Sequence, residues 1–243
     1  MIRSRETYVI GKPVLSVRNM KKRFGINIRT VRDLRIVPVL ICVLVLCFGE
    51  KTLAEEEMTP QIALTFDDGP HPVYTAQILD GLKERGVKAT FFVIGKNIEG
   101  NEELLERMHQ EGHLIGNHTY SHKKLDCIEK QAAAEELEKT SELVERVTGE
   151  GTEFARPPFG VWNKALEYDV TMLPVMWSID TLDWTTKNVP ATVEKVMKQV
   201  KDQDIILFHD CYASSAQAAL QVVDLLLDQG YEFVTVDQII LAP

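Results

Sequence analysis

The sequence is poor in cysteine and shows no internal repeat or low-complexity segment. Its four cysteines include no C-x-x-C pair, so they indicate neither a cysteine-based zinc site nor an established disulfide. Cys127 and Cys211, the two outside the N-terminal apolar segment, are expected to be buried as small hydrophobic side chains. With 243 residues and 45% hydrophobic content, the chain can bury one large core, which favours a single folded domain over a disordered chain.

Positive charge is scarce beyond the first 35 residues. Residues 1–35 carry ten Lys and Arg against two acidic residues, whereas the rest of the chain carries 17 against 34. A domain with such an acidic excess lacks the basic surface by which proteins bind nucleic acid. We therefore expect no nucleic-acid partner.

Only one long apolar run is present, Ile36–Phe48, directly after the basic head 1–35. It is short for a membrane span of about 20 residues and suits the core of a signal peptide, with small residues before Glu55 as a cleavage site. We expect export, with the head left inside and residues 36–54 either cleaved or kept as an anchor. A buried core helix is the alternative, and the true start is either Met1 or Met20. Residues 55–59 then form a linker ahead of a domain over 60–243.

Short apolar segments alternate with longer amphipathic ones from residue 60 onward. The expected strands are Ile62–Phe66, Ala89–Ile94, Leu114–Asn117, Glu153–Arg156, Pro174–Ile179, Ile205–His209 and Glu232–Val236. The expected helices are Tyr74–Arg85, Glu102–Gln110, Glu129–Val147, Ala191–Lys201 and Ala216–Asp228. This alternation predicts an α/β fold with a parallel sheet, either open or closed into a barrel.

Polar side chains gather where the expected strands end. They are Asp67, Asp68, His118, His122, Arg156, Asp180, Asp183, Trp184, His209 and Asp210. The carboxyl ends of parallel strands form the edge at which α/β proteins assemble their sites. We therefore expect these side chains to lie close together.

The stretch Asp67-Asp68-Gly69-Pro70 has two interpretations. It is either an exposed turn built from the usual turn formers or part of a metal site. His118 and His122, with three residues between them, would project to one side of a helical turn. With one carboxylate they would form a set of two imidazoles and one oxygen that leaves positions open for water and substrate, as catalytic metal sites require. The second carboxylate would stay free to take a proton.

Five motifs, "TFDDGP", "HTYSH", "RPPFG", "DTLDW" and "ILFHD", resemble in order and spacing those of the polysaccharide deacetylases of the NodB-homology type, carbohydrate esterase family four. The resemblance covers residues 60–243, and five ordered motifs are far more specific than one. It implies a distorted, incomplete (β/α) barrel of parallel strands with outer helices. It also implies a metal-dependent hydrolase that removes acetyl groups from N-acetylated sugars.

The resemblance assigns a role to each motif residue. Asp67 resembles the catalytic base, and Asp68, His118 and His122 resemble the ligands of a divalent metal ion. Arg156 resembles the residue that pairs with the base and holds it.

Further roles follow from the later motifs. His209 resembles the general acid that protonates the leaving amine, and Asp183 the carboxylate that orients it. Phe159 stands where the family commonly has tyrosine, and its backbone N–H would still contact the oxyanion. Trp184 and Leu207 would form walls of the pocket for the acetyl methyl group.

The expected substrate is a polymer that contains N-acetylglucosamine. Peptidoglycan comes first, because a basic head and an export signal suit a bacterial chain acting at the cell wall. Chitin oligomers, O-acetylated xylan and a catalytically inactive carbohydrate-binding relative are alternatives. A non-haem iron oxygenase would use the same ligand types, but such enzymes usually have antiparallel sheets. Zinc is the expected metal, although such a site also accepts cobalt, nickel or manganese. We expect a monomer that meets the membrane only through its N-terminal segment.

Overall fold

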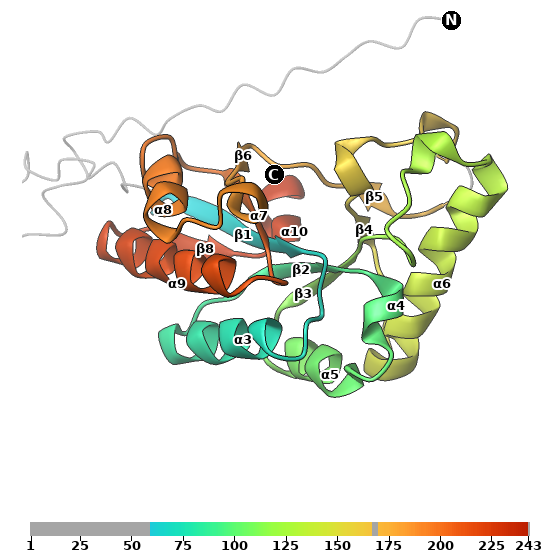
Figure 1. The fold of residues 1–243 in the computed structure, drawn as a ribbon, viewed down its shortest axis with the longest axis horizontal. Helices are drawn as coiled ribbons and strands as arrows, with labels where there is room; N and C mark the ends of the chain where they lie inside the picture. The colour runs from blue at the N-terminus through green and yellow to red at the C-terminus, as the bar shows by residue number, and fades with distance from the viewer. Residues whose placement is uncertain (1–58, 167–169, 243) are drawn as a thin grey trace, which may run out of the picture. The chain divides into compact units, whose positions relative to one another are not determined.

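The computed structural model describes residues 59–166 and 170–242, which form a curled sheet of parallel strands surrounded by helices (Figure 1). The strand order is β5-β4-β3-β2-β1-β7-β6, and β8 pairs with the first residues of β1. The strands are β1 (Gln61–Asp67), β2 (Thr90–Val93), β3 (Leu114–Asn117), β4 (Phe154–Ala155), β5 (Leu173–Pro174), β6 (Ile179–Asp180), β7 (Asp204–His209) and β8 (Glu232–Val234). The expected incomplete barrel of parallel strands with outer helices is confirmed.

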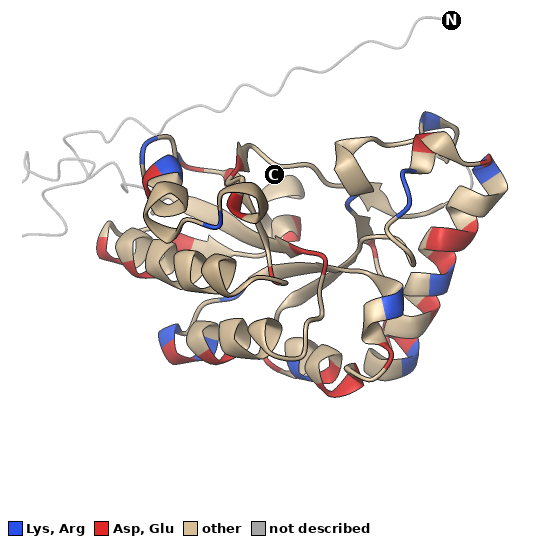
Figure 2. Ribbon diagram, viewed as in Figure 1, with Lys and Arg blue, Asp and Glu red and all other residues tan. Residues whose placement is uncertain are grey.

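Helices cover the outside of the sheet, and neighbours in space follow the order α8, α9, α3, α5, α6 (Figure 1). Their bounds are α3 (Tyr74–Arg85), α5 (Glu102–Gln110), α6 (Lys130–Thr148), α8 (Val189–Met197) and α9 (Ala213–Asp228). Three shorter helices are α4 (Gly95–Ile98), α7 (Asp183–Thr186) and α10 (Val236–Ile240). Charged side chains are concentrated on the outer helices, whereas the strands carry few (Figure 2).

The alternation of side chains along β1 separates two parts of the core. Ile62, Leu64 and Phe66 are buried in the large hydrophobic cluster that also takes in the outer helices. Ala63 belongs to a separate, smaller cluster. Asp67 has the same parity as Ala63, so the strand directs its side chain to the inner side of the barrel.

The prediction of a single strand over Pro174–Ile179 is wrong. Its two ends belong to opposite edges of the sheet, because β5 pairs with β4 and β6 pairs with β7. The residues between them, 175–178, cross the seam between these two edges. Such a short connection brings the two edges close together, so the sheet is curled, and β5 and β6 do not pair across this seam.

Other expected elements agree with the structure to within a few residues. The bounds expected for α3, α5 and β3 are confirmed. The last strand ends at Val234 rather than at Val236, because Thr235 starts α10 with a capping box. The helices α4, α7 and α10 are too short to show a helical period in the sequence.

The cysteines differ in part from expectation. Cys127 is exposed, because it lies in a short 3₁₀ turn whose buried residue is Leu125. Cys211 is half-buried, and both thiols are free.

The N-terminal predictions fall outside the described residues. These are the basic head, the apolar run Ile36–Phe48 and all but the last residue of the expected linker. Among residues 59–166 and 170–242, no helix is both long enough and apolar enough to span a membrane.

Candidate active site

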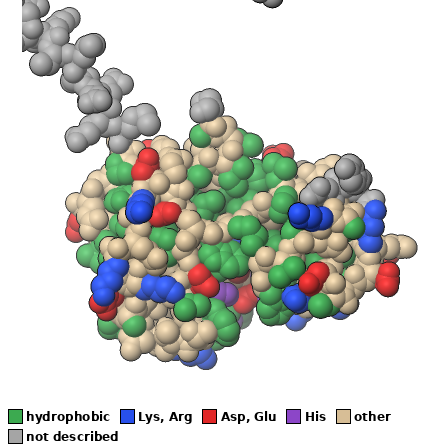
Figure 3. Space-filling model, turned by 90° about the horizontal axis from the view of Figure 1, so that it is seen from above, with side chains coloured by type: hydrophobic (Ala, Val, Ile, Leu, Met, Phe, Trp, Pro, Cys, Tyr) green, Lys and Arg blue, Asp and Glu red, His purple; other side chains and the backbone are tan. Residues whose placement is uncertain are grey.

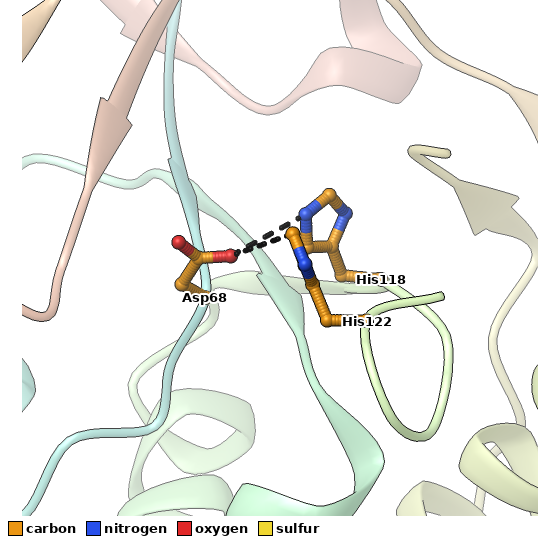
Figure 4. A group of neighbouring side chains, drawn as sticks. All are labelled: Asp68, His118 and His122. Carbon is orange, nitrogen blue, oxygen red and sulfur yellow. Dashed lines mark ion pairs between the residues drawn. The ribbon is translucent and has the colours of Figure 1, made fainter. Parts of the chain in front are cut away.

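The two neighbouring carboxylates after β1 point in different directions because their backbones differ. Asp67 ends the strand and is buried. Asp68 has a φ of 77°, which breaks the alternation of the strand and turns its side chain toward the two histidines (Figure 4). Gly69 follows because a Cβ there would lie 2.1 Å from Oδ2 of the buried Asp210. Gly69 and Pro70 are themselves buried, so the stretch is not an exposed turn.

Asp68, His118 and His122 converge on one point (Figure 4). Oδ1 of Asp68 lies 3.5 Å from Nε2 of His118 and 3.3 Å from Nε2 of His122. This oxygen is buried without a hydrogen-bond partner, which is unfavourable for a carboxylate unless a cation lies beside it. One carboxylate and two imidazoles suit zinc and related divalent ions. The group therefore fits the expected metal.

The two histidines converge in a different way from the expected helical turn. They lie in an irregular loop after β3, in which Thr119 and His122 have φ values of 65° and 58°. This left-handed backbone places the imidazole centroids 5.0 Å apart. Nδ1 of His118 donates to the carbonyl of Arg156 at 2.6 Å, which leaves its Nε2 available to a metal. Burial, and then the nearby His118, lower the pKa of His122, which favours the neutral imidazole that metals bind.

Arg156 is fully buried and connects Asp67 to the seam. Its Nη1 donates to Oδ1 of Asp67 at 2.8 Å and to Oγ1 of Thr65 at 2.7 Å. Its Nε and Nη2 donate to the seam carbonyls of Val175 and Met176 at 3.3 and 3.2 Å. The expected contact with Asp67 is therefore present, and the same guanidinium also binds the segment that crosses between the sheet edges.

His209 lies beside Asp67, because the two residues are register partners at the ends of β7 and β1. Nδ1 of His209 donates to Oδ1 of Asp183 at 2.8 Å, and its backbone N–H donates to Oδ2 at 2.9 Å. Burial lowers the pKa of His209. The hydrogen bond and charge of Asp183, with the charges of Asp67 and Asp68, outweigh burial and raise the pKa to about 9. The imidazole is therefore protonated at neutral pH, with Nε2 left to donate.

A cavity of about 390 Å³ opens over these side chains. Seen from above, histidine lies at the bottom of a hollow bordered by hydrophobic and acidic side chains (Figure 3). Phe159, Trp184 and Leu207 line the cavity. The Phe159 ring packs edge-on against His122 at a centroid distance of 5.0 Å and is 67% exposed. The site thus combines a polar floor with apolar and aromatic walls.

Two further residues of the cavity, Trp177 and Tyr212, are not predicted from the sequence. Trp177 lies in the seam, which the sequence presents as the interior of a strand. Tyr212 follows His209 by three residues, a spacing that does indicate the same loop. Asp210 shows the opposite result. It directly follows β7, at the end of the strand as expected, but does not line the cavity, because it is buried and accepts a hydrogen bond from Oγ1 of Thr75 at 2.5 Å.

Comparisons with known proteins give a consistent result. The family model of polysaccharide deacetylase matches residues 54–176. The chain is 41% identical over 188 residues to the peptidoglycan-N-acetylmuramic acid deacetylase PdaC of Bacillus subtilis. The aligned region covers 76% of this chain and 40% of PdaC. It is 38% identical over 179 residues to the peptidoglycan-N-acetylglucosamine deacetylase PgdA of Listeria monocytogenes, covering 74% of this chain and 38% of PgdA. The chain thus spans about two fifths of the length of these curated relatives.

The fold agrees with the sequence comparison. A solved structure of PdaC from Bacillus subtilis superimposes with a TM-score of 0.73 and 41% identity, over 75% of this chain and 90% of that chain. Sequence, family model and fold together show that the chain belongs to the polysaccharide deacetylase family.

Proposed function

We propose that this domain is a metal-dependent deacetylase that hydrolyses N-acetyl groups of a polysaccharide, with N-acetylglucosamine of peptidoglycan as the substrate. The observation that carries the proposal is the convergence of Asp68, His118 and His122 beside the in-register pair Asp67 and His209. A site that only bound carbohydrate would need neither the second carboxylate nor a protonated histidine next to a metal-ligand set.

Amide hydrolysis requires a nucleophile and a base beside it. A divalent cation bound by Asp68, His118 and His122 would polarise the amide carbonyl and lower the pKa of a bound water. Asp67 is the neighbouring carboxylate that is not a ligand, with Oδ2 at 3.8 Å from Nε2 of His118. Its other oxygen is held by Arg156. We assign to Asp67 the role of general base, which accepts the proton of the attacking water.

Breaking the carbon–nitrogen bond requires a proton on the leaving amine. His209 is protonated at neutral pH, and its Nε2 donates this proton while Nδ1 stays bonded to Asp183. The backbone N–H of Phe159 is assigned to the developing oxyanion. The side chains of Trp184 and Leu207 enclose the acetyl methyl group. In this assignment each motif residue has a separate task.

The substrate can be tested directly with the purified protein. We expect zinc-loaded protein to release acetate from peptidoglycan, and a chelator to remove this activity. Peptidoglycan leads because both curated relatives described above are named peptidoglycan deacetylases. N-acetylated chitooligosaccharides and acetylated xylan are assayed in parallel. Release from xylan alone would contradict an N-deacetylase, and absence of acetate from all three substrates would contradict the enzyme.

The alkaline limb of the pH profile depends on Asp183. His209 donates only while protonated, so kcat/KM falls as the pH rises through the pKa of His209, which Asp183 raises. In Asp183→Asn the largest of the interactions that raise this pKa is lost, whereas burial still lowers it. We expect the alkaline limb of kcat/KM to move to lower pH. Glu194→Gln, on the exposed surface of α8, is the control, and an unmoved limb in Asp183→Asn would contradict the role of His209.

We also propose that the domain acts outside the cytoplasm, because Ile36–Phe48 and the basic residues before it have the pattern of an export segment. External protease on intact cells should then degrade an anchored form, or the culture medium should contain a cleaved form. Recovery of the domain only from a protease-protected cytoplasmic fraction would contradict export.

A further inference from the structure

The loop that carries His122 is held by a carboxylate from an outer helix. Glu136, on α6, is only 8% exposed although it is charged. Its Oε2 accepts a hydrogen bond from the backbone N–H of Ser121 at 2.7 Å. Its Oε1 accepts one from the Ser121 hydroxyl, also at 2.7 Å. Both oxygens of one buried carboxylate are thus bonded to the residue directly before His122.

This contact matters because the loop has no regular secondary structure to fix it. His118 lies directly after β3, and its ring is held by the Arg156 carbonyl. The His122 ring, in contrast, makes no hydrogen bond to any of the described residues. The backbone at Thr119 and His122 is left-handed, which is unfavourable for residues with a Cβ unless surrounding contacts impose it. Thr119 is held by Oδ1 of Asn117 and by the N–H of Gly95, whereas at Ser121, directly before His122, the two bonds from Glu136 supply such contacts.

We propose that Glu136 is a positioning residue for the metal centre, which fixes the His122 imidazole through Ser121. The inference rests on the proposed metal site. Residues outside the ligand set that orient ligands typically change metal affinity 10–100-fold when they are removed. Lys123 also contacts Glu136, at 3.1 Å, but its side chain is 56% exposed, so this ion pair contributes little.

The test measures zinc affinity of the purified full chain by competition with a chromogenic chelator, together with thermal unfolding of the metal-free protein. We expect Glu136→Ala to weaken zinc binding about 10–100-fold. The zinc affinity of Glu136→Gln should lie between those of the wild type and Glu136→Ala, since the amide oxygen keeps one acceptor. Lys123→Met should change affinity less than about fivefold, and Glu138→Gln, exposed on the same helix, should match the wild type.

Three outcomes decide the inference. Wild-type zinc affinity in a folded Glu136→Ala variant would overturn it. If Glu136→Ala does not fold, Ser121→Ala takes its place, and unchanged affinity in both Ser121→Ala and Glu136→Gln would overturn it equally. A purely structural role would lower the unfolding temperature of the metal-free variants with no change in zinc affinity. Failure of the wild type to bind zinc would contradict the proposed metal centre itself, which distinguishes the two failures.

Discussion

His122→Ala is expected to lose the bound metal and at least about a thousandfold in kcat/KM. A catalytic metal contributes several kcal/mol to the stabilisation of charge in the transition state, and each 1.4 kcal/mol is a factor of ten in rate. His122 is the suitable ligand to remove, because its side chain is 29% exposed and its loss leaves no large buried void. Metal content after dialysis and the rate of acetate release provide the measurement.

His109→Ala is the matched control for this variant. His109 is an exposed histidine near the end of α5 and lines a separate cavity, so its removal should leave both metal content and rate unchanged. A His122→Ala protein that keeps one equivalent of metal would show that the ligand set is wrong. His118→Ala should also lose the metal, but the hydrogen bond to the Arg156 carbonyl is lost with it.

Asp67→Asn is expected to keep the metal and to lose about 10²–10⁴ in rate, the usual contribution of a general base. Asparagine has nearly the same shape as aspartate, and its amide oxygen can still accept the hydrogen bond that Arg156 Nη1 donates to Oδ1. Thermal unfolding of the variant checks that the buried guanidinium is still accommodated, because an unpaired buried charge costs about 3–5 kcal/mol. Metal content and kcat are measured on the same preparation.

Asp68→Asn separates the roles of the two neighbouring carboxylates. It is expected to weaken metal binding strongly, since Oδ1 of Asp68 is the oxygen that faces both Nε2 atoms. The reverse pattern, with metal lost in Asp67→Asn and kept in Asp68→Asn, would exchange the assignments of base and ligand.

The sequence predicts those parts of the domain that depend on local pattern. The boundaries of α3, α5 and β3 follow from hydrophobic periodicity. The polar residues at strand ends follow from the geometry of parallel sheets. For this reason Asp67 and His209 could be expected at one edge before their register was known.

The remaining features depend on contacts between residues distant in sequence. The segment 174–179 is apolar enough to predict one strand, but its two ends pair with opposite edges, and no local pattern records this change of partner. The bonds from Glu136 to Ser121 span 15 positions. The left-handed backbone of His122 and Phe159 contradicts their ordinary preferences, as is common at functional sites.

The position of Arg156 links the proposed chemistry of this domain to its fold. The guanidinium reaches Asp67 at the end of the central strand and the carbonyls of Val175 and Met176 in the seam. One buried side chain therefore holds both the proposed base and the segment that crosses between the two edges of the sheet. A substitution that displaces this segment would also disturb the orientation of Asp67, although it leaves every motif residue in place.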